Sequence, residues 1–453
     1  MSISLGQQYD LIVAGGGPAG TTLAALVAMR GHRVLLLEKE HFPRYQIGES
    51  LLPTTVHGIG RLLGVCDELD ASGFTVKQGG TFRWGSKPEP WTFYFHDLPA
   101  FAHGKAYAYQ VERMRFDTIL LNNARRVGVD VREGCSAVDI IAGSGRVKGI
   151  HYTDEDHRAH SVAARFVADA SGYRSRIYRG MAGQRHYSDF FRNIALFAYF
   201  ENGMRFPDPK SGNILTAAFE DGWFWYIPLT RTLTSVGAVV RRELAQSVQG
   251  DPQRALAGLI ASCPLISQHL AAATRVTEGP YGQIRVRRDY SHCHDRFHQP
   301  GMVLVGDTAC FVDPVLSSGV HLATYGALLA ARAINGSLAG TVPEERGLAE
   351  FERRYRAEYT YFYEFLRAFY AKNVNEQSYF WEAKRLTGSA LSDIVAFVEL
   401  VGGAASGEPA LITGDELLHS YAARSAGSEA GGSAPAPGSL IPSADGMSWE
   451  WAA

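Results

Sequence analysis

Apolar residues along this chain fall into two patterns: short uninterrupted runs, and longer stretches in which they recur every three or four positions. The first run, Tyr9–Ala14, leads directly into a glycine-rich turn at residues 15–20 and a helical pattern at residues 21–30. A second apolar run at residues 33–38 ends in an acidic residue. Apolar strands separated by a helix predict a βαβ unit with a parallel sheet.

The remaining patterns extend this α/β beginning into a mixed protein. Strand patterns cover residues 74–84, 129–167, 193–242 and 301–309. Helical patterns cover residues 53–63, 111–121, 251–270, 321–335 and 344–372. Residues 425–442 are rich in Gly, Ser, Ala and Pro, a composition that predicts a flexible segment. We therefore expect an α/β core, a second region of α+β type built on a β-sheet, C-terminal helices and a flexible tail.

Composition narrows the classes of function. The chain has 453 residues, 46% of them hydrophobic and 20% charged, which is ordinary for a globular protein of two or three domains. A formal net charge of −2 gives no reason to expect a nucleic-acid partner. Five scattered cysteines without a CxxC pair argue against a metal site or a disulfide scaffold. No leader or membrane-spanning apolar run is visible, so we expect a cytoplasmic protein without a membrane partner.

The glycine-rich turn has the spacing of a dinucleotide-binding fingerprint, Gly15-x-Gly17-x-x-Gly20. Gly15 permits the tight turn, Gly17 lets the backbone approach a pyrophosphate, and Gly20 allows helix and strand to pack closely. The helix start faces the phosphates, and Glu38 at the end of the second strand can bond a ribose diol. Because strand, turn, helix and acid stand in the required order, the motif predicts a bound dinucleotide. Arg44 in the following loop can pair with a pyrophosphate or be an ordinary surface arginine.

Two later segments carry side chains that are unusual for their surroundings. Lys77 places one amine in an apolar, glycine-rich strand segment between Phe74 and Trp84. Such a lysine is either an ordinary strand residue or a desolvated amine with a lowered pKa. Trp223 and Trp225 alternate in another strand, where tryptophans most often belong to a core. Taken one at a time, each of these segments is more often structural than functional.

Taken together, the segments resemble one branch of the flavoproteins. The fingerprint, Asp169-Ala-Ser-Gly172 and Gly306-Asp307 stand in the order typical of the aromatic-hydroxylase-like FAD-binding Rossmann fold. Gly222-Trp-x-Trp-x-Ile-Pro228 and Val76-Lys-x-Gly-Gly-Thr-Phe-Arg-Trp-Gly85 are similar to segments of the flavin-dependent halogenases. The resemblance covers nearly the whole chain. It is closest to the carrier-protein-dependent halogenases of tyrosine and other phenols in glycopeptide and related non-ribosomal peptide antibiotic pathways.

The resemblance implies a halogenase, an oxidoreductase with a monooxygenase-like fold. FADH2 from a separate flavin reductase, reaching the enzyme by contact or by diffusion, would react with O2 and chloride to give hypochlorous acid. Lys77 would be the catalytic residue that carries this oxidant to the substrate, by bonding hypochlorous acid or as a haloamine. The resemblance assigns cofactor binding to Gly15, Gly17, Ala19, Gly20, Glu38, Arg44, Arg113 and Asp307, halide binding to Ser318 and Gly319, and a flavin-side filter to Trp223, Trp225, Ile227 and Pro228.

The filter and one departure from the family pattern bear on the substrate. Bulky side chains beside the flavin would keep an organic substrate from the site where the same fold otherwise hydroxylates. Tryptophan halogenases carry a glutamate two residues before the position of Ser318, and here that residue is Leu316. An indole cation loses a carboxylate partner there, whereas a phenol stabilises the cation through its own oxygen. We therefore expect a phenol of the tyrosine, β-hydroxytyrosine or hydroxyphenylglycine type, or an activated pyrrole, presented on a peptidyl carrier protein.

Two other functions are compatible with the sequence: an FAD-dependent aromatic monooxygenase, and a non-catalytic flavin-binding protein that docks on a biosynthetic assembly line. Halide dependence of the product distinguishes the monooxygenase from the halogenase, and turnover excludes the docking protein. The expected division is a discontinuous FAD-binding domain of residues 1–69, 107–180 and 279–340, a substrate domain of residues 70–106 and 181–278, a C-terminal helical region of residues 341–424, and a flexible tail of residues 425–453.

Overall fold

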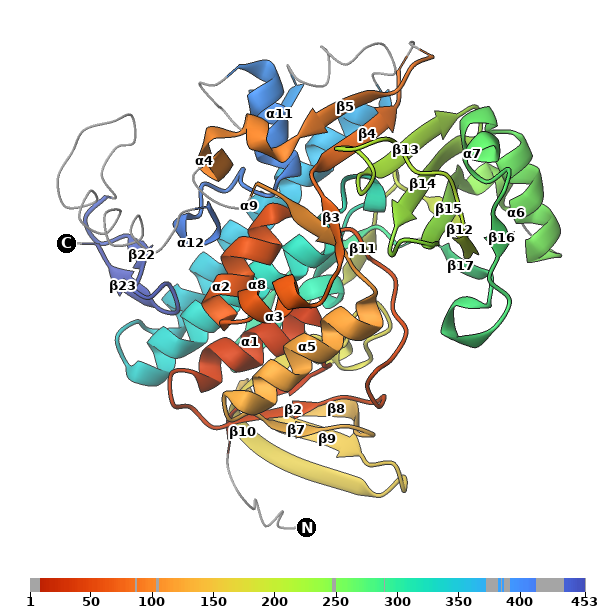
Figure 1. Ribbon diagram of the computed structural model, residues 1–453. Helices are drawn as coiled ribbons and strands as arrows, with labels where there is room; N and C mark the ends of the chain where they lie inside the picture. The colour runs from red at the N-terminus through yellow and green to blue at the C-terminus, as the bar shows by residue number, and fades with distance from the viewer. Residues whose placement is uncertain are drawn as a thin grey trace.

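A largely parallel sheet lies toward the lower edge of the view in Figure 1, which shows the computed structural model. The structure describes residues 9–85, 88–102, 106–246, 250–288, 290–371, 382–383, 385–386, 392–412 and 436–452. The strand order is β19 (His298–Gln299), β20 (Met302–Leu304), β10 (Ala159–Asp169), β1 (Tyr9–Ala14), β2 (Val34–Leu37) and β7 (Asp130–Arg132). All neighbours run parallel except β19 and β20. The predicted α/β class is thereby confirmed, and the glycine-rich turn follows the carboxyl end of the central strand β1.

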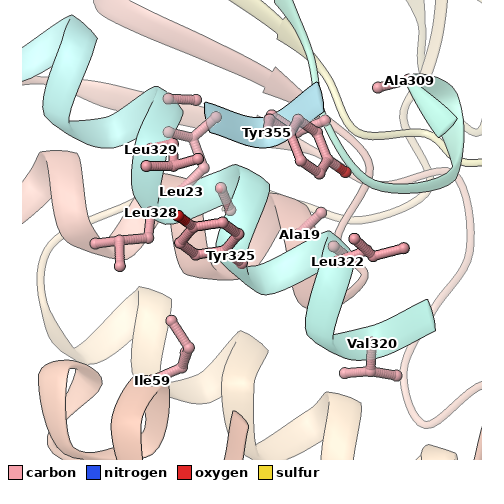
Figure 2. Close-up of a cluster of buried hydrophobic side chains, with 14 of the residues drawn as sticks. Ala19, Leu23, Ile59, Ala309, Val320, Leu322, Tyr325, Leu328, Leu329 and Tyr355 are labelled. Carbon is pink, nitrogen blue, oxygen red and sulfur yellow. The ribbon is translucent and has the colours of Figure 1, made fainter. Parts of the chain in front are cut away.

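The helices beside this sheet pack tightly around one long helix. Helix α1 (Pro18–Ala28) lies between α5 (Arg113–Arg126) and α8 (Ser318–Ala339), and α8 in turn packs on α9 (Glu344–Ala371). Figure 2 shows Leu328 and Leu329 of α8 in one buried cluster with Leu23 of α1 and Tyr355 of α9. Gly326 is needed in α8, because a Cβ atom there would overlap the ring of Tyr355. This close packing fixes the start of α8 relative to the nucleotide fingerprint.

A second, largely antiparallel sheet lies at the upper right of the view in Figure 1, away from the first. Its order is β16 (Thr274–Arg275), β12 (Asn193–Glu201), β15 (Leu233–Arg241), β14 (Gly222–Pro228), β13 (Ile214–Phe219), β4 (Gly79–Arg83) and β5 (Trp91–Tyr94), with β17 (Arg285–Arg288) also on β12. Helices α6 (Pro252–Ala261) and α7 (Pro264–His269) cover one face, and Pro264 separates them where the sequence predicts one helix. Since β17 pairs with β12, we extend our proposed substrate domain to residue 288.

Several shorter elements join the two sheets. Strands β3 (Thr75–Lys77) and β6 (Ala108–Gln110) pair with each other, and residues 49–51 are hydrogen-bonded along the free side of β6. A π-helix at Thr54–Ile59 precedes α2 (Gly60–Leu63) and α3 (Cys66–Ala71), and α4 (Pro99–Ala102) follows β5. Strands β8 (Ser136–Gly143) and β9 (Arg146–Thr153) extend β10, and all three lie within the strand pattern predicted for residues 129–167. Strands β11 (Arg185–Tyr187), β18 (His292–His294) and β21 (Cys310–Phe311) form a small sheet.

The C-terminal part corrects one prediction. Beyond α9 lie α11 (Asp393–Val401), α12 (Pro409–Ile412) and a hairpin of β22 (Leu440–Pro442) and β23 (Trp449–Trp451). The flexible tail predicted for residues 425–453 is therefore wrong for residues 436–452, and residues 425–435 lie outside the described part. Trp449 is fully buried, with the guanidinium groups of Arg332 and Arg354 5.0 and 4.6 Å from its ring. Burial of one tryptophan between two cations anchors a segment whose composition indicates flexibility.

Candidate active site

The fingerprint turn has the shape that a dinucleotide requires. Gly15 has φ +105°, and a Cβ atom there would overlap the backbone of Ala170. At Gly17 an added Cβ would meet only Arg44 Nη2, at 3.5 Å, so the backbone is open to a ligand on this side. The buried carboxylate of Glu38 accepts hydrogen bonds from the amides of Gly16 at 2.7 Å and of Glu40 at 2.9 Å. These bonds hold Glu38 beside the turn, at the position expected of a residue that binds the ribose of a dinucleotide.

One buried carboxylate positions both arginines assigned to the cofactor. Asp117 Oδ2 accepts from Arg44 Nη1 at 2.7 Å, and both oxygens accept from Arg113, at 2.7 and 2.9 Å. Arg113 also donates to the carbonyl of Ile47 at 2.7 Å, which ties the loop after Arg44 to the start of α5. Sequence reasoning missed Asp117. Its position four residues after Arg113 on the same predicted helix is the signal that could have indicated it.

The late Gly-Asp turn lies against the fingerprint helix. A Cβ atom on Gly306 would be 3.0 Å from the Cβ of Ala19. Within the described residues, the carboxylate of Asp307 makes no hydrogen bond, and burial raises its pKa to about 6 despite the nearby guanidinium of Arg113. An acceptor left without a protein donor beside an open glycine turn suits a hydroxylated cofactor chain. The residues therefore fit FAD: Asp307 would hold its ribityl chain and Arg44 its pyrophosphate.

The start of α8 has the features of an anion site. The preceding residue, Ser317, adopts a left-handed conformation with φ +60°, and its side chain does not cap the helix. No acidic residue occupies the first turn, so no side chain there competes for the amides of the buried Ser318 and of Gly319. Free amides and the helix dipole favour a small anion, and the site fits chloride. A side chain at Gly319 would strike the ring of Phe311, which lies 2.8 Å from its Cβ position.

Lys77 is a desolvated amine. Only 2% of the residue is exposed, and Nζ donates one hydrogen bond, to the carbonyl of Leu51 at 2.9 Å. The ring of Phe95 lies 5.4 Å from Nζ. Burial lowers the pKa of Lys77 to about 7, and no charged group contributes to that shift. A substantial fraction of the amine is therefore neutral near pH 7, with a lone pair that an ordinary surface lysine lacks.

The two tryptophans form a wall on one face of β14. Trp223 is 1% and Trp225 6% exposed, and both belong to the main core between the two sheets, as does Ile227. The alternate residues Phe224 and Tyr226 face α6 and α7 instead. Pro228 ends the strand and pairs with β15. Strand alternation thus directs all the bulky residues of the predicted filter to the side where the flavin is expected.

A buried hydrogen-bond chain connects this wall to residues 313–319, the segment that contains the predicted halide-binding residues Ser318 and Gly319 (here called the halide segment). Trp223 Nε1 donates to the hydroxyl of Tyr370 at 2.5 Å, and that hydroxyl donates to Asp313 Oδ1 at 3.0 Å. Asp313 caps the turn that leads into Ser318, by accepting from the amide of Val315 at 3.1 Å. Burial raises the pKa of Asp313 to about 6. Sequence reasoning missed Tyr370 and Asp313, because only the tertiary fold brings α9 between β14 and α8.

Fold and site together are those of a flavoprotein in which a nucleotide fingerprint, a helix start without a side-chain cap and a buried amine lie in one chain. The chain belongs to the tryptophan halogenase family of flavin-dependent halogenases, whose sequence model matches residues 10–103 and 96–423. It is therefore an oxidoreductase that uses FADH2, chloride and O2, and enzymes of this kind need a separate flavin reductase.

Individual relatives agree with this assignment. The chain is 35% identical to a tryptophan 2-halogenase of Chondromyces crocatus over 394 residues, covering 86% of this chain and 73% of that protein. It is 31% identical to the flavin-dependent halogenase rdc2 of Metacordyceps chlamydosporia, covering 80% and 71%. The structure of the FAD-dependent, myxobacterial chondrochloren halogenase CndH superposes with a TM-score of 0.82 at 52% identity, over 98% of this chain and 100% of that chain.

These relatives confirm the family and leave the narrower expectation, a carrier-protein-dependent halogenase of phenols, as a proposal. Within the described residues, no helix is both long and apolar enough to cross a membrane.

Proposed function

We propose that this halogenase chlorinates a phenolic ring of the tyrosine, β-hydroxytyrosine or hydroxyphenylglycine type, tethered to a peptidyl carrier protein in antibiotic biosynthesis. The observation that carries the proposal is the environment of Lys77. The Lys77 amine is buried, its pKa is about 7, and burial rather than a neighbouring carboxylate accounts for that pKa. An amine in this state suits transfer of an electrophilic halogen to a ring that is already electron-rich.

Residues at the helix start and in the wall would divide the reaction between two places. FAD, once reduced and supplied with O2, provides the oxidising equivalents for chloride. The amides at Ser318 and Gly319 would hold chloride beside it, and the indoles of Trp223 and Trp225 would exclude an organic ring from that space. The oxidised halogen would then reach the substrate only through the buried amine of Lys77.

A phenol is favoured over an indole because of Leu316. This residue is 4% exposed and apolar, two positions before Ser318, and it offers no carboxylate to a developing ring cation. A phenol delocalises that charge onto its own oxygen and then loses a proton. The similarity to a tryptophan 2-halogenase makes free tryptophan the competing substrate that a test must include.

Mass spectrometry of candidate substrates tests the proposal. Purified enzyme, FAD, a flavin reductase, NADH and chloride are incubated with tyrosyl- and hydroxyphenylglycyl-carrier proteins, with free tyrosine and with free tryptophan. We expect a chlorine isotope pattern on a carrier-bound phenol and none on tryptophan. Chlorination of tryptophan alone would overturn the substrate class, and hydroxylation in place of chlorination would indicate the aromatic monooxygenase. A parallel reaction without halide is the control.

A further inference from the structure

A second buried ionisable group, Glu49, lies two residues before Leu51, whose carbonyl accepts the hydrogen bond from Lys77. Glu49 is 2% exposed and begins the segment of residues 49–51. Val111 donates its amide to the carbonyl of Glu49 at 2.7 Å, and Leu51 donates its amide to the carbonyl of Tyr109 at 3.0 Å. Leu51 is also the residue whose carbonyl accepts from Lys77. One short segment therefore connects the delivering amine to a buried carboxyl group.

A row of hydroxyl groups leads from this carboxyl toward the surface. Tyr199 donates to Glu49 Oε1 at 2.6 Å, and the hydroxyls of Tyr45 and Tyr199 are 2.8 Å apart. Tyr45 is only partly buried, and the guanidinium of Arg285 lies 3.7 Å from its ring centre. The other oxygen of Glu49, Oε2, is buried and makes no hydrogen bond within 3.5 Å to the described residues, although the hydroxyl of Ser235 lies near the carboxyl and lowers its pKa. A buried carboxyl with one oxygen on a hydroxyl row and the other without a close hydrogen bond can pass a proton onward.

The surroundings of Glu49 keep its proton available near neutral pH. Burial raises the pKa of Glu49 to about 7, while the hydroxyls of Tyr199 and Ser235 and the charge of Arg113 oppose the rise. The groups that act on this carboxyl or are affected by it are Tyr45, Glu112, Arg113, Tyr199, Ser235 and Tyr281. Ser235 also accepts a hydrogen bond from Trp225 Nε1 at 3.2 Å. Through Ser235, Glu49 is therefore connected to one tryptophan of the wall.

The halogenation reaction consumes a proton that neither chloride nor O2 brings. Overall, FADH2, O2, chloride and one proton give FAD, hypochlorous acid and one water. O2 accepts four electrons, two from FADH2 and two from chloride, and the proton balances the charge. Trp223 and Trp225 are 1% and 6% exposed, and a buried acid close to them is a group that can supply this proton.

We propose that Glu49 delivers this proton to the flavin-side site, and that Tyr199 and Tyr45 return a proton to Glu49 from solvent. The proposal rests on the flavin-dependent halogenation common to the family, and it is independent of which ring is chlorinated. Arg113, which affects both Glu49 and Asp307, connects the carboxyl with the cofactor side of the site.

Glu49→Gln is the primary test, because the amide keeps the shape and an acceptor for Tyr199 but carries no acidic proton. We expect FAD affinity to be unchanged in a fluorescence titration, and chlorinated product per O2 consumed to fall on the order of 100-fold. The wild-type yield should fall as pH rises through about 7, and Glu49→Gln should lose this limb of the profile. Glu49→Asp should restore part of it. Glu112→Gln removes a neighbouring carboxylate outside the row; because Glu112 raises the pKa of Glu49, this variant should keep the limb of the profile and move it to lower pH.

An infrared measurement tests the proposal without turnover. In the FAD-free protein, a protonated-carboxyl band should titrate near pH 7 and be absent from Glu49→Gln. Tyr45→Phe should leave the first turnover intact and slow the following ones. The proposal is overturned if Glu49→Gln retains the wild-type yield and pH profile, if it loses FAD binding, or if no such band exists. Failure of the wild type to make any chloride-dependent product would refute the halogenase function. The infrared measurement does not depend on turnover, so the two failures can be told apart.

Discussion

An amine buried in an apolar environment either finds an anion or loses its proton, and among the residues that the structure describes no anion acts on Lys77. In the same part of the chain its hydrogen-bond acceptor is the neutral carbonyl of Leu51, and burial lowers its pKa to about 7. Because the desolvation cost falls on the charged form, the same feature that weakens stability supplies a nucleophile. A local conflict between sequence and environment of this kind indicates a functional residue.

Lys77→Ala should uncouple the enzyme. Flavin binding and O2 consumption should be unchanged, because the Lys77 amine interacts with Leu51 and Phe95, outside the fingerprint and the start of α8, while chlorinated product falls on the order of 100-fold or more. Lys77→Arg should fail as well, since a guanidinium remains protonated. Product by mass spectrometry and peroxide or hypochlorous acid by a coupled dye give the two readouts. Near wild-type chlorination by Lys77→Ala would mean that the lysine is structural.

The stability of a Lys77→Met variant should depend on pH with a defined sign. The pKa in the folded protein, about 7, lies below the ordinary value of 10.5, so folding favours the neutral amine. The wild type bears no penalty above pH 10.5, a growing penalty as pH falls toward 7, and the full penalty below 7. Methionine has no charge, so Lys77→Met should be more stable by a few kcal/mol at pH 6, with the difference shrinking toward pH 10. Urea unfolding at both pH values measures this, and a pH-independent difference would contradict it.

At the scale of elements, strand β14 contributes side chains to two different buried clusters, because successive residues of a strand point to opposite faces. Its residues at odd positions, Trp223, Trp225 and Ile227, join the core between the sheets, while Phe224 and Tyr226 pack under α6 and α7. Both faces are buried, so periodicity alone does not distinguish a filter from a core strand. The hydrogen bond from Trp223 to Tyr370 of α9 adds a polar connection toward the halide segment.

Trp223→Ala should create a cavity in this wall and cost roughly 3–5 kcal/mol of unfolding free energy. Peroxide should leak, because water and small solutes then reach the flavin side. Trp223→Phe keeps most of the bulk and loses the bond to Tyr370, so it should retain coupling better than alanine does. Urea unfolding and peroxide release per O2 are the measurements. Wild-type stability and coupling in Trp223→Ala would contradict the filter at this position.

At the scale of the whole molecule, the source of electrons follows from how many nucleotide sites the chain has. The sequence holds one GxGxxG fingerprint, at residues 15–20, and no second one for NADPH. The purified protein with FAD should therefore oxidise NADH or NADPH no faster than free FAD does, and chlorination should begin when a flavin reductase is added. Absorbance at the nicotinamide band follows the reaction. Rapid oxidation by the halogenase alone would contradict this prediction.

Prediction succeeded where a few neighbouring residues decide the outcome. The β1–turn–α1 unit, the long helices α8 and α9 and most strands of the second sheet were visible as local patterns, whereas β5, β16 and β17 were not predicted. It failed at the C-terminal hairpin, where the burial of Trp449 against Arg332 and Arg354 outweighs a flexible composition. It also placed one helix at residues 251–270, where Pro264 starts a second.

The sequence by itself determined the nucleotide fingerprint, the family and the residue types of the site, because each depends on short motifs formed by neighbouring residues of the chain. It could not determine the state of those residues. Desolvation of Lys77, the shared carboxylate of Asp117, and the contacts of Glu49 with Tyr199 and of Trp223 with Tyr370 join positions far apart in the chain. Burial and long-range hydrogen bonds set proton affinities, and both exist only once the two sheets and α9 have packed together.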